Sequence, residues 1–185
     1  MEYAPHPTHA ERESAKRILC ALLQHNGGAF KGQTLLYKAF YWAHLYYWKE
    51  FPGVLTTYPF ARMPYGPGIH GGEDLLFEMQ RENLIRIEDR NPTDPYGARS
   101  FRLTMDFSVN LTPKERRAVE YGLKKVRGRR AFQASREAHG WSRSWKRSRD
   151  GQVINIYEDF LTERQFQENW AANRAAAKIA DRVFS

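Results

Sequence analysis

The chain has 185 residues, of which 42% are hydrophobic and 27% are charged, and its formal net charge is +8. This composition excludes a wholly disordered chain, and the length suits one domain with a substantial core. No apolar run is long enough to span a bilayer, and the N-terminus lacks the pattern of a signal peptide, so we expect a cytoplasmic protein with no membrane partner.

The first two predicted elements are helices. Thr8 and Glu11 have the spacing of a capping box, and apolar residues follow at intervals of three and four until Gly27 and Gly28. The second helix, residues 32–50, is apolar around most of its circumference, which predicts a buried central helix. On this helix we expect His44 to be a hydrogen-bonded core residue.

A strand over residues 54–62 is predicted to enter a rigid elbow at residues 63–68, with the sequence Met-Pro-Tyr-Gly-Pro-Gly. The prolines fix their own φ angles, and the glycines allow backbone angles that are closed to other residues. Tyr65 in this elbow either packs on the core or contacts a partner. A third helix is predicted over residues 69–82, with Leu75, Leu76 and Met79 facing inward.

Two short alternating segments, residues 84–87 and 100–103, predict a β-hairpin around the turn-rich segment 89–97. A helix followed by such a hairpin has the element order of a winged-helix unit. This resemblance concerns order only, and order does not establish function.

The last third of the chain is predicted to be mainly helical. Thr112, Pro113 and Glu115 mark the start of a basic helix that runs to about residue 126. Another helix is expected over residues 129–139 with Phe132 buried, and a final helix is expected to reach toward residue 183. The predicted fold class is therefore α+β and mainly α-helical: a bundle around a buried central helix, a small β-hairpin in winged-helix-like order, and a C-terminal helical extension.

The positive charge is concentrated in residues 114–149, whose net charge is +10. A basic segment in an otherwise balanced chain predicts attraction to nucleic acid or to an acidic protein surface, although solvated helix faces are also commonly rich in lysine and arginine. The candidate nucleic-acid contacts are Lys124, Lys125, Arg127, Arg129, Arg130, Arg143, Lys146 and Arg147.

Three sequence blocks follow one another along the chain. They are Leu35-Leu36-Tyr37-Lys38-Ala39, the elbow Pro64-Tyr65-Gly66-Pro67, and Ser135-Arg136-Glu137 followed by Trp141 and Gly151-x-x-Ile154. In order and character they resemble the Panacea antitoxin domain, also called the SocA-like antitoxin domain, which is a phage-associated family. The resemblance covers about residues 15–161, and Arg136 and Met63 stand where histidine and tryptophan are common in the family.

The resemblance implies that residues 1–161 form an antitoxin domain and that residues 162–185 are a C-terminal helical extension. It implies a protein that binds and neutralises a cognate toxin, and one branch of the family delivers toxin to a cellular protease. Toxin and protease are therefore candidate partners, the basic segment and the winged-helix-like order make DNA a further candidate, and a homodimer stays open. The candidate partner-binding residues are Tyr37, Tyr65, Glu137, Trp141 and Trp145.

The residues themselves do not indicate an enzyme, a cofactor or a metal site. The histidines are scattered without the spacing of a metal site, and Cys20 has the register of a buried thiol. His139 and Glu137 could form a proton-transfer pair, and the glycines from Gly66 onward superficially resemble a phosphate-binding loop, but no accompanying nucleophile, lysine or βαβ pattern supports either role.

Two function classes stay open from the sequence. The first is a protein-binding module that sequesters a toxin through aromatic and arginine-rich surface. The second is a nucleic-acid-binding regulator, in which the winged-helix-like unit or the basic segment contacts phosphate. An antitoxin that represses its own operon would combine the two.

Overall fold

Two capping boxes begin helices in the computed structural model, which describes residues 6–88, 98–104, 108–165 and 167–168. Helix α1 (His9–His25) starts after Thr8, whose hydroxyl accepts a hydrogen bond from the backbone N–H of Glu11. The Glu11 carboxylate accepts one in return from the backbone N–H of Thr8. Helix α4 (Pro113–Val126) starts in the same way with Thr112 and Glu115. Both predicted starts are confirmed.

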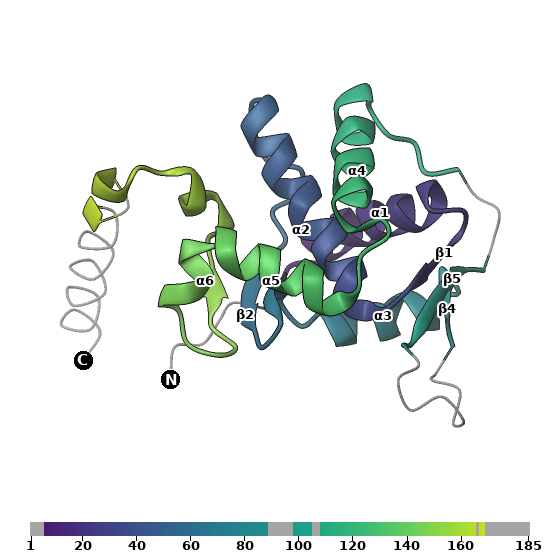
Figure 1. The fold of residues 1–185 in the computed structure, drawn as a ribbon. Coiled ribbons are helices and arrows are strands. Elements are labelled where there is room, and N and C mark those ends of the chain that lie inside the picture. The colour runs from purple at the N-terminus through teal and green to yellow at the C-terminus, as the bar shows by residue number, and fades with distance from the viewer. Residues whose placement is uncertain (1–5, 89–97, 105–107, 166, 169–185) are drawn as a thin grey trace, which may run out of the picture.

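Helix α2 (Gln33–Glu50) is the buried centre of the fold, as predicted. Every residue from 36 to 45 is buried, and helices α1, α4 and α5 (Ala131–Trp141) pack around it. Figure 1 shows α2 and α4 side by side. Their backbones approach closely at Gly122 of α4, where a Cβ would overlap the carbonyl oxygen of Ala39 and lie 3.1 Å from the Cβ of Ala43.

One antiparallel sheet has the strand order β1-β5-β4 and lies at the right of Figure 1. Strands β4 (Ile85–Glu88) and β5 (Ser100–Leu103) form the predicted hairpin, while its turn lies outside the described residues. Strand β1 (Ala29–Lys31) pairs with β5 and was not predicted, because it has only three residues and its partner is distant in sequence.

The second antiparallel sheet has the order β3-β2-β6 and contains the elbow. Strand β2 (Phe60–Met63) turns through Pro64 and Tyr65 into β3 (Gly66–Ile69), and β6 (Val153–Ile154) pairs with the other edge of β2. The prediction of a strand beginning at residue 54 was wrong, since only residues 60–63 are extended and paired. The elbow is thus the tip of a β-hairpin and not a direct link between a strand and a helix.

Helix α3 (Gly72–Arg81) begins three residues later than predicted, because Ile69 is the last residue of β3. Its inward residues Leu75, Leu76 and Met79 are buried, as predicted. The chain leaves the helix through Asn83, which has a positive φ of 57°.

After α4 the described chain continues through α5, the short α6 (Arg143–Arg147), strand β6 and the 3₁₀ helix η1 (Ile156–Phe160), running from the centre to the left of Figure 1. The buried Asp159 carboxylate of η1 accepts a 2.7 Å hydrogen bond from the backbone N–H of Ser144, which fastens η1 to α6. Residues 163–165 and 167–168 are helical, and the rest of the predicted C-terminal helix lies outside the described residues.

The fold class is therefore the predicted one, α+β and mainly α-helical, with two small antiparallel sheets where one hairpin was expected. Among the described residues, none of the helices combines the length and the apolar character needed to cross a membrane.

Candidate functional site

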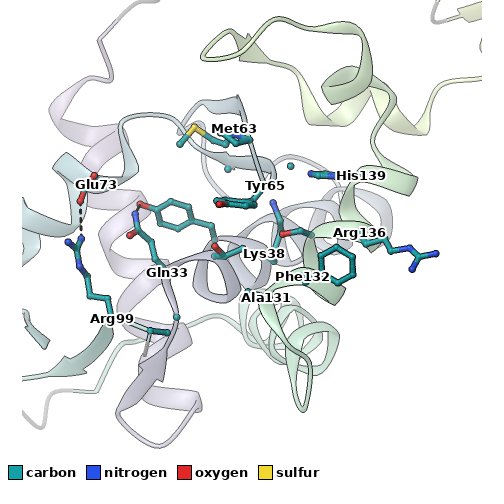
Figure 2. A pocket seen from close by; sticks show the side chains of 18 residues that line it. Gln33, Lys38, Met63, Tyr65, Glu73, Arg99, Ala131, Phe132, Arg136 and His139 are labelled. Carbon is teal, nitrogen blue, oxygen red and sulfur yellow. Dashed lines mark hydrogen bonds and ion pairs between the residues drawn. The ribbon is translucent and has the colours of Figure 1, made fainter. Parts of the chain in front are cut away.

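A pocket of about 1100 Å³ lies where α2, the β2–β3 hairpin and α5 meet (Figure 2). We call it the elbow pocket. Residues from all three sequence blocks line it, although these blocks are up to about a hundred positions apart. Its lining consists of Gly32, Gln33, Thr34, Tyr37, Lys38, Met63, Pro64, Tyr65, Gly66, Gly68, Glu73, Ala98, Arg99, Ala131, Phe132, Ser135, Arg136 and His139.

The elbow is held in place from its outer side. The indole Nε1 of Trp145 donates a 2.8 Å hydrogen bond to the carbonyl oxygen of Met63, and the guanidinium of Arg62 lies 4.5 Å from the centre of the Trp145 ring. Strand β6 adds the sheet pairing described above. Trp145 was predicted to contact a partner, and the structure places it as a partly buried support behind the elbow.

Gly66 leaves the space in which two polar side chains approach the elbow. Its φ of 97° favours glycine, and a Cβ there would lie 2.9 Å from Lys38 Nζ and 3.1 Å from His139 Nε2. The lysine of α2 and the histidine of α5 therefore converge on one point of the pocket wall.

Lys38 is a buried cation, with only 2% of its surface exposed. Its Nζ donates a 2.7 Å hydrogen bond to the carbonyl oxygen of Pro67, and no carboxylate of the described residues forms an ion pair with it. Burial lowers the pKa of Lys38 to about 7, because the charged form loses its hydration without gaining a counter-charge.

Two further polar atoms in the pocket lining have no hydrogen-bond partner among the described residues: the buried Oγ of Ser135 and the buried Nε2 of His139. Their residues are four positions apart, so they lie on the same face of α5. Burial and then the charge of Lys38 lower the pKa of His139, so the imidazole is neutral at pH 7. Its ring stacks on Trp145 with centroids 4.0 Å apart.

Away from Lys38 and His139, the pocket is lined by polar side chains that are paired with one another. The hydroxyl of Tyr37 accepts a 2.8 Å hydrogen bond from Gln33, and Arg99 pairs with Glu73 at 2.9 Å. Tyr37 was predicted to contact a partner, and it is buried in the pocket lining. Burial raises the pKa of Tyr37, so its hydroxyl stays protonated.

Two exposed aromatic side chains stand at the rim of the pocket. Tyr65 is 66% exposed at the tip of the hairpin, and Phe132 is 72% exposed on α5. The prediction that Phe132 is buried was wrong, because α5 packs inward through the smaller Ala134 and Ala138, which lie on another side of the helix. Tyr65 is on the surface, so its packing on the core is excluded.

The two other predicted partner-binding residues lie outside the pocket lining. Trp141 is 44% exposed at the end of α5, where its ring meets Phe160 edge-on. Glu137 forms ion pairs with Lys125 of α4 and with Arg129. Since Glu137 and His139 are two positions apart on a helix, they face different directions and form no proton-transfer pair.

The predicted nucleic-acid residues fall into two groups. Lys124, Arg127 and Arg130 are exposed around the end of α4, whereas Lys125 and Arg129 are engaged by Glu137. On α6, Arg143 and Arg147 pair with Glu163, and Lys146 donates a hydrogen bond to the carbonyl oxygen of Gly140.

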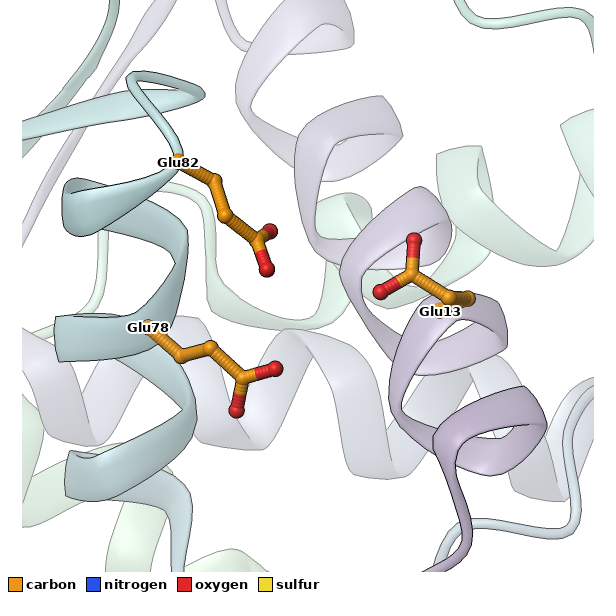
Figure 3. Close-up of side chains that lie close together, drawn as sticks. All are labelled: Glu13, Glu78 and Glu82. Carbon is orange, nitrogen blue, oxygen red and sulfur yellow. The ribbon is translucent and has the colours of Figure 1, made fainter.

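Three carboxylates face one another between α1 and α3: Glu13, Glu78 and Glu82 (Figure 3). Although their spacing would suit a metal ion, the centre of the cluster is occupied by Lys16. Its Nζ lies 2.8 Å from Glu13, 2.7 Å from Glu78 and 2.6 Å from Glu82. These contacts raise the pKa of Lys16 and lower that of Glu78, so this is a structural ion cluster.

We expect Lys16→Met to lower the free energy of unfolding by about 1 to 3 kcal/mol at pH 7, because partly exposed carboxylates would face one another without their cation. The pKa of folded Glu78 is below its unfolded value, so its contribution is present above pH 4.5 and lost as the pH falls further. Urea denaturation at pH 7 and pH 3.5 measures this. Lys49→Met, at an exposed pair with Glu50, is the control and should change stability by less than about 0.5 kcal/mol.

Two further polar residues of the core are placed as the sequence predicts. His44 is fully buried, with Nδ1 2.8 Å from the carbonyl oxygen of Phe40 and Nε2 2.8 Å from the hydroxyl of Thr56, as expected of a core histidine. Burial lowers its pKa to about 4. Cys20 is a buried thiol, as predicted, and burial raises its pKa to about 12.

Three site residues were not predicted from the sequence, namely Lys38, Ser135 and Phe132. Lys38 and Ser135 belong to the sequence blocks without having been given a role, and Phe132 was expected in the core. A signal for Lys38 was present: it is a lysine in the middle of a helix that is otherwise apolar around its circumference. Charged residues are almost never fully buried without a partner or a function. The convergence with α5 had no local signal, because it depends on tertiary packing.

Comparisons of the chain with protein-family models, with curated proteins and with solved structures found no match.

Proposed function

We propose that this chain is an antitoxin that neutralises a cognate protein toxin by direct binding, and that the elbow pocket and its rim are the toxin-binding surface. The observation that carries the proposal is the convergence of the three sequence blocks on one pocket with an exposed aromatic rim. These blocks are the ones that resemble the Panacea antitoxin domain.

The rim has the composition of an interaction hot spot. Folding stabilises a protein by burying aromatic side chains, yet Tyr65 and Phe132 are mostly exposed on either side of a pocket. Large exposed aromatics beside a concave site are enriched at protein interfaces, where they fill pockets of the partner. A protein partner would bury both rings at once.

A protein partner is favoured over DNA by the charge of α3. In a winged-helix arrangement the helix before the hairpin would approach the DNA, and here its first turn carries Glu73 and Asp74. Both residues are exposed. Their carboxylates would face phosphate groups of the same sign, which is unfavourable.

The test is co-expression with the product of the neighbouring reading frame, whose expression alone should stop growth. We expect the wild-type chain to restore growth and to form a complex. Tyr65→Ala and Phe132→Ala should each weaken the complex by about 2 kcal/mol, or roughly 30-fold in Kd, and reduce the rescue. Isothermal titration calorimetry and a growth assay measure these effects.

Phe77→Ala is the matched control, since Phe77 is an exposed aromatic residue of α3 outside the pocket lining. It should leave both Kd and rescue unchanged, and circular dichroism should show that all three variants are folded. Rescue that survives loss of both rim aromatics would contradict the proposed surface. A complex with DNA that weakens steeply between low and physiological salt, without toxin rescue, would instead support the regulator.

A further inference from the structure

We propose that the elbow pocket is a binding site for a carboxylate group, held by Lys38 together with Ser135 and His139. The inference rests on the proposed function and deepens it: in the complex, the carboxylate would be an acidic side chain or the C-terminus of the toxin. The shared chemistry of both sources is a single negative charge on two oxygen atoms.

The ammonium group of Lys38 lacks the partner that a buried cation requires. An unpaired charge loses several kcal/mol of hydration on burial, and proteins normally offset this with an ion pair. In the same molecule the buried ammonium group of Lys16 has such partners, because three glutamates surround it. Lys38 is equally buried, yet among the described residues its Nζ has only the Pro67 carbonyl oxygen. A bound carboxylate would supply the counter-charge.

The unpartnered atoms of α5 lie on the same pocket. Ser135 is 95% buried, and its hydroxyl has no hydrogen-bond partner among the described residues. It can donate to a carboxylate oxygen without any change of protonation. His139 Nε2 is also unpartnered, while the ring has a hydrogen bond with the backbone of Tyr65. Nε2 donates to a carboxylate when it carries a proton, either in that tautomer or in the imidazolium form. Buried polar atoms are nearly always paired, so these atoms together indicate an absent ligand.

The charge around the pocket suits a monoanion. Glu73 faces the pocket from α3 but is paired with Arg99, while Tyr37 and His139 are neutral at pH 7. Arg136 of α5 extends away from the cavity in Figure 2. Lys38 is thus the one buried positive charge of the described lining, and a single carboxylate neutralises it, whereas a phosphate dianion would bring a second buried charge.

The experiment follows the side-chain resonances of Lys38 by NMR in the full chain labelled in its lysines. The probes are acetate, N-acetyl-glutamate amide for a side-chain carboxylate, and N-acetyl-alanine for a C-terminal carboxylate. Acetamide and N-acetyl-glutamine amide are the neutral counterparts of the first two probes. We expect the carboxylates, and not the amides, to shift Lys38 and the backbone signals of Ser135 and His139. The stronger of the two peptide-like probes identifies the source.

Lys38→Met removes the charge and keeps the length of the side chain, and it should weaken carboxylate binding at least tenfold, as expected for a charge-assisted hydrogen bond. Lys31→Met makes the same change at an exposed lysine of β1 and should leave binding unchanged. Affinity should also fall as the pH rises above 7, because Lys38 loses its proton. Equal shifts with amides and carboxylates, no shifts at all, or tighter binding of inorganic phosphate would each overturn the proposal.

Toxin binding by the same variants is the second part of the experiment. If a toxin is captured, Lys38→Met should raise its Kd at least tenfold and Lys31→Met less than twofold. Unchanged capture by Lys38→Met would show that no toxin carboxylate enters the pocket, while the rim variants would still test the proposed function. Conversely, carboxylate binding in the NMR experiment without toxin capture would leave the site intact and refute the antitoxin.

Discussion

Gly122→Ala should destabilise the fold by at least about 3 kcal/mol, the largest effect that we expect from a single methyl group. Overpacking a core typically costs about 1 to 3 kcal/mol, and here the obstructing atom is the backbone carbonyl oxygen of Ala39, which cannot rotate away. Helices α2 and α4 would have to separate along the main interface of the bundle. Urea denaturation followed by circular dichroism measures the loss.

Gly140→Ala is the matched control, because Gly140 is also a helical glycine and a Cβ there would meet no atom within 4 Å. Alanine has the higher helix propensity, so this variant should gain about 0.5 to 1 kcal/mol. If Gly122→Ala were as stable as Gly140→Ala, the close approach of α2 and α4 would be wrong.

The stability of the wild-type protein should rise by about 2 to 3 kcal/mol between pH 7 and pH 9 because of Lys38. The folded pKa of about 7 is below the unfolded value of 10.5, so the unfolded chain binds more protons throughout this interval and stability increases with pH. Cys20 acts in the opposite direction as the pH approaches the unfolded thiol pKa of 9.0, so the comparison ends at pH 9.

Chemical denaturation at pH 7, 8 and 9 checks this result. Lys38→Met has no group that titrates at this position, so its stability should be nearly independent of pH over the same range. Lys31→Met should keep the rise of the wild type, because Lys31 is exposed. A wild type as insensitive to pH as Lys38→Met would mean that the amine is solvated or paired in solution.

Local signals explain the parts of the fold that could be predicted. The capping boxes at Thr8 and Thr112 are short motifs whose hydrogen bonds depend on neighbouring residues, and both helices begin where these motifs predict. Helix α2 was recognised from its continuous apolar surface. These features need no knowledge of the rest of the chain.

The hairpin at the elbow shows why other parts could not be predicted. Strand β3 has the sequence Gly-Pro-Gly-Ile, and glycine and proline disfavour strands. These residues therefore predicted a turn where the structure has a strand. Pro67 is tolerated because β3 is at the edge of its sheet, where a missing N–H leaves no neighbour unpaired. The pairing with β2 and β6 is a tertiary property.

The residues of the candidate site also fall into those that local sequence indicates and those that depend on tertiary packing. Tyr65 could be singled out from its proline-framed turn, whereas the approach of Lys38 and His139 to Gly66 depends on the packing of α5 against α2. The exposure of Phe132 could not be predicted, since a large apolar residue on a helix is ordinarily buried. The buried residues of α5 are instead the small Ala134, Ser135 and Ala138.

The order in which the pocket walls occur along the chain determines when the pocket can form during translation. Helix α2 and the hairpin are complete by residue 69, but the α5 wall spans residues 131–141, and the strand that supports the hairpin comes at residues 153–154. Chains are translated from the N-terminus and domains fold as they emerge. A nascent chain that ends before α5 therefore has the residues of the elbow without the pocket, and the pocket and its supporting strand are complete only when residues near 154 have left the ribosome.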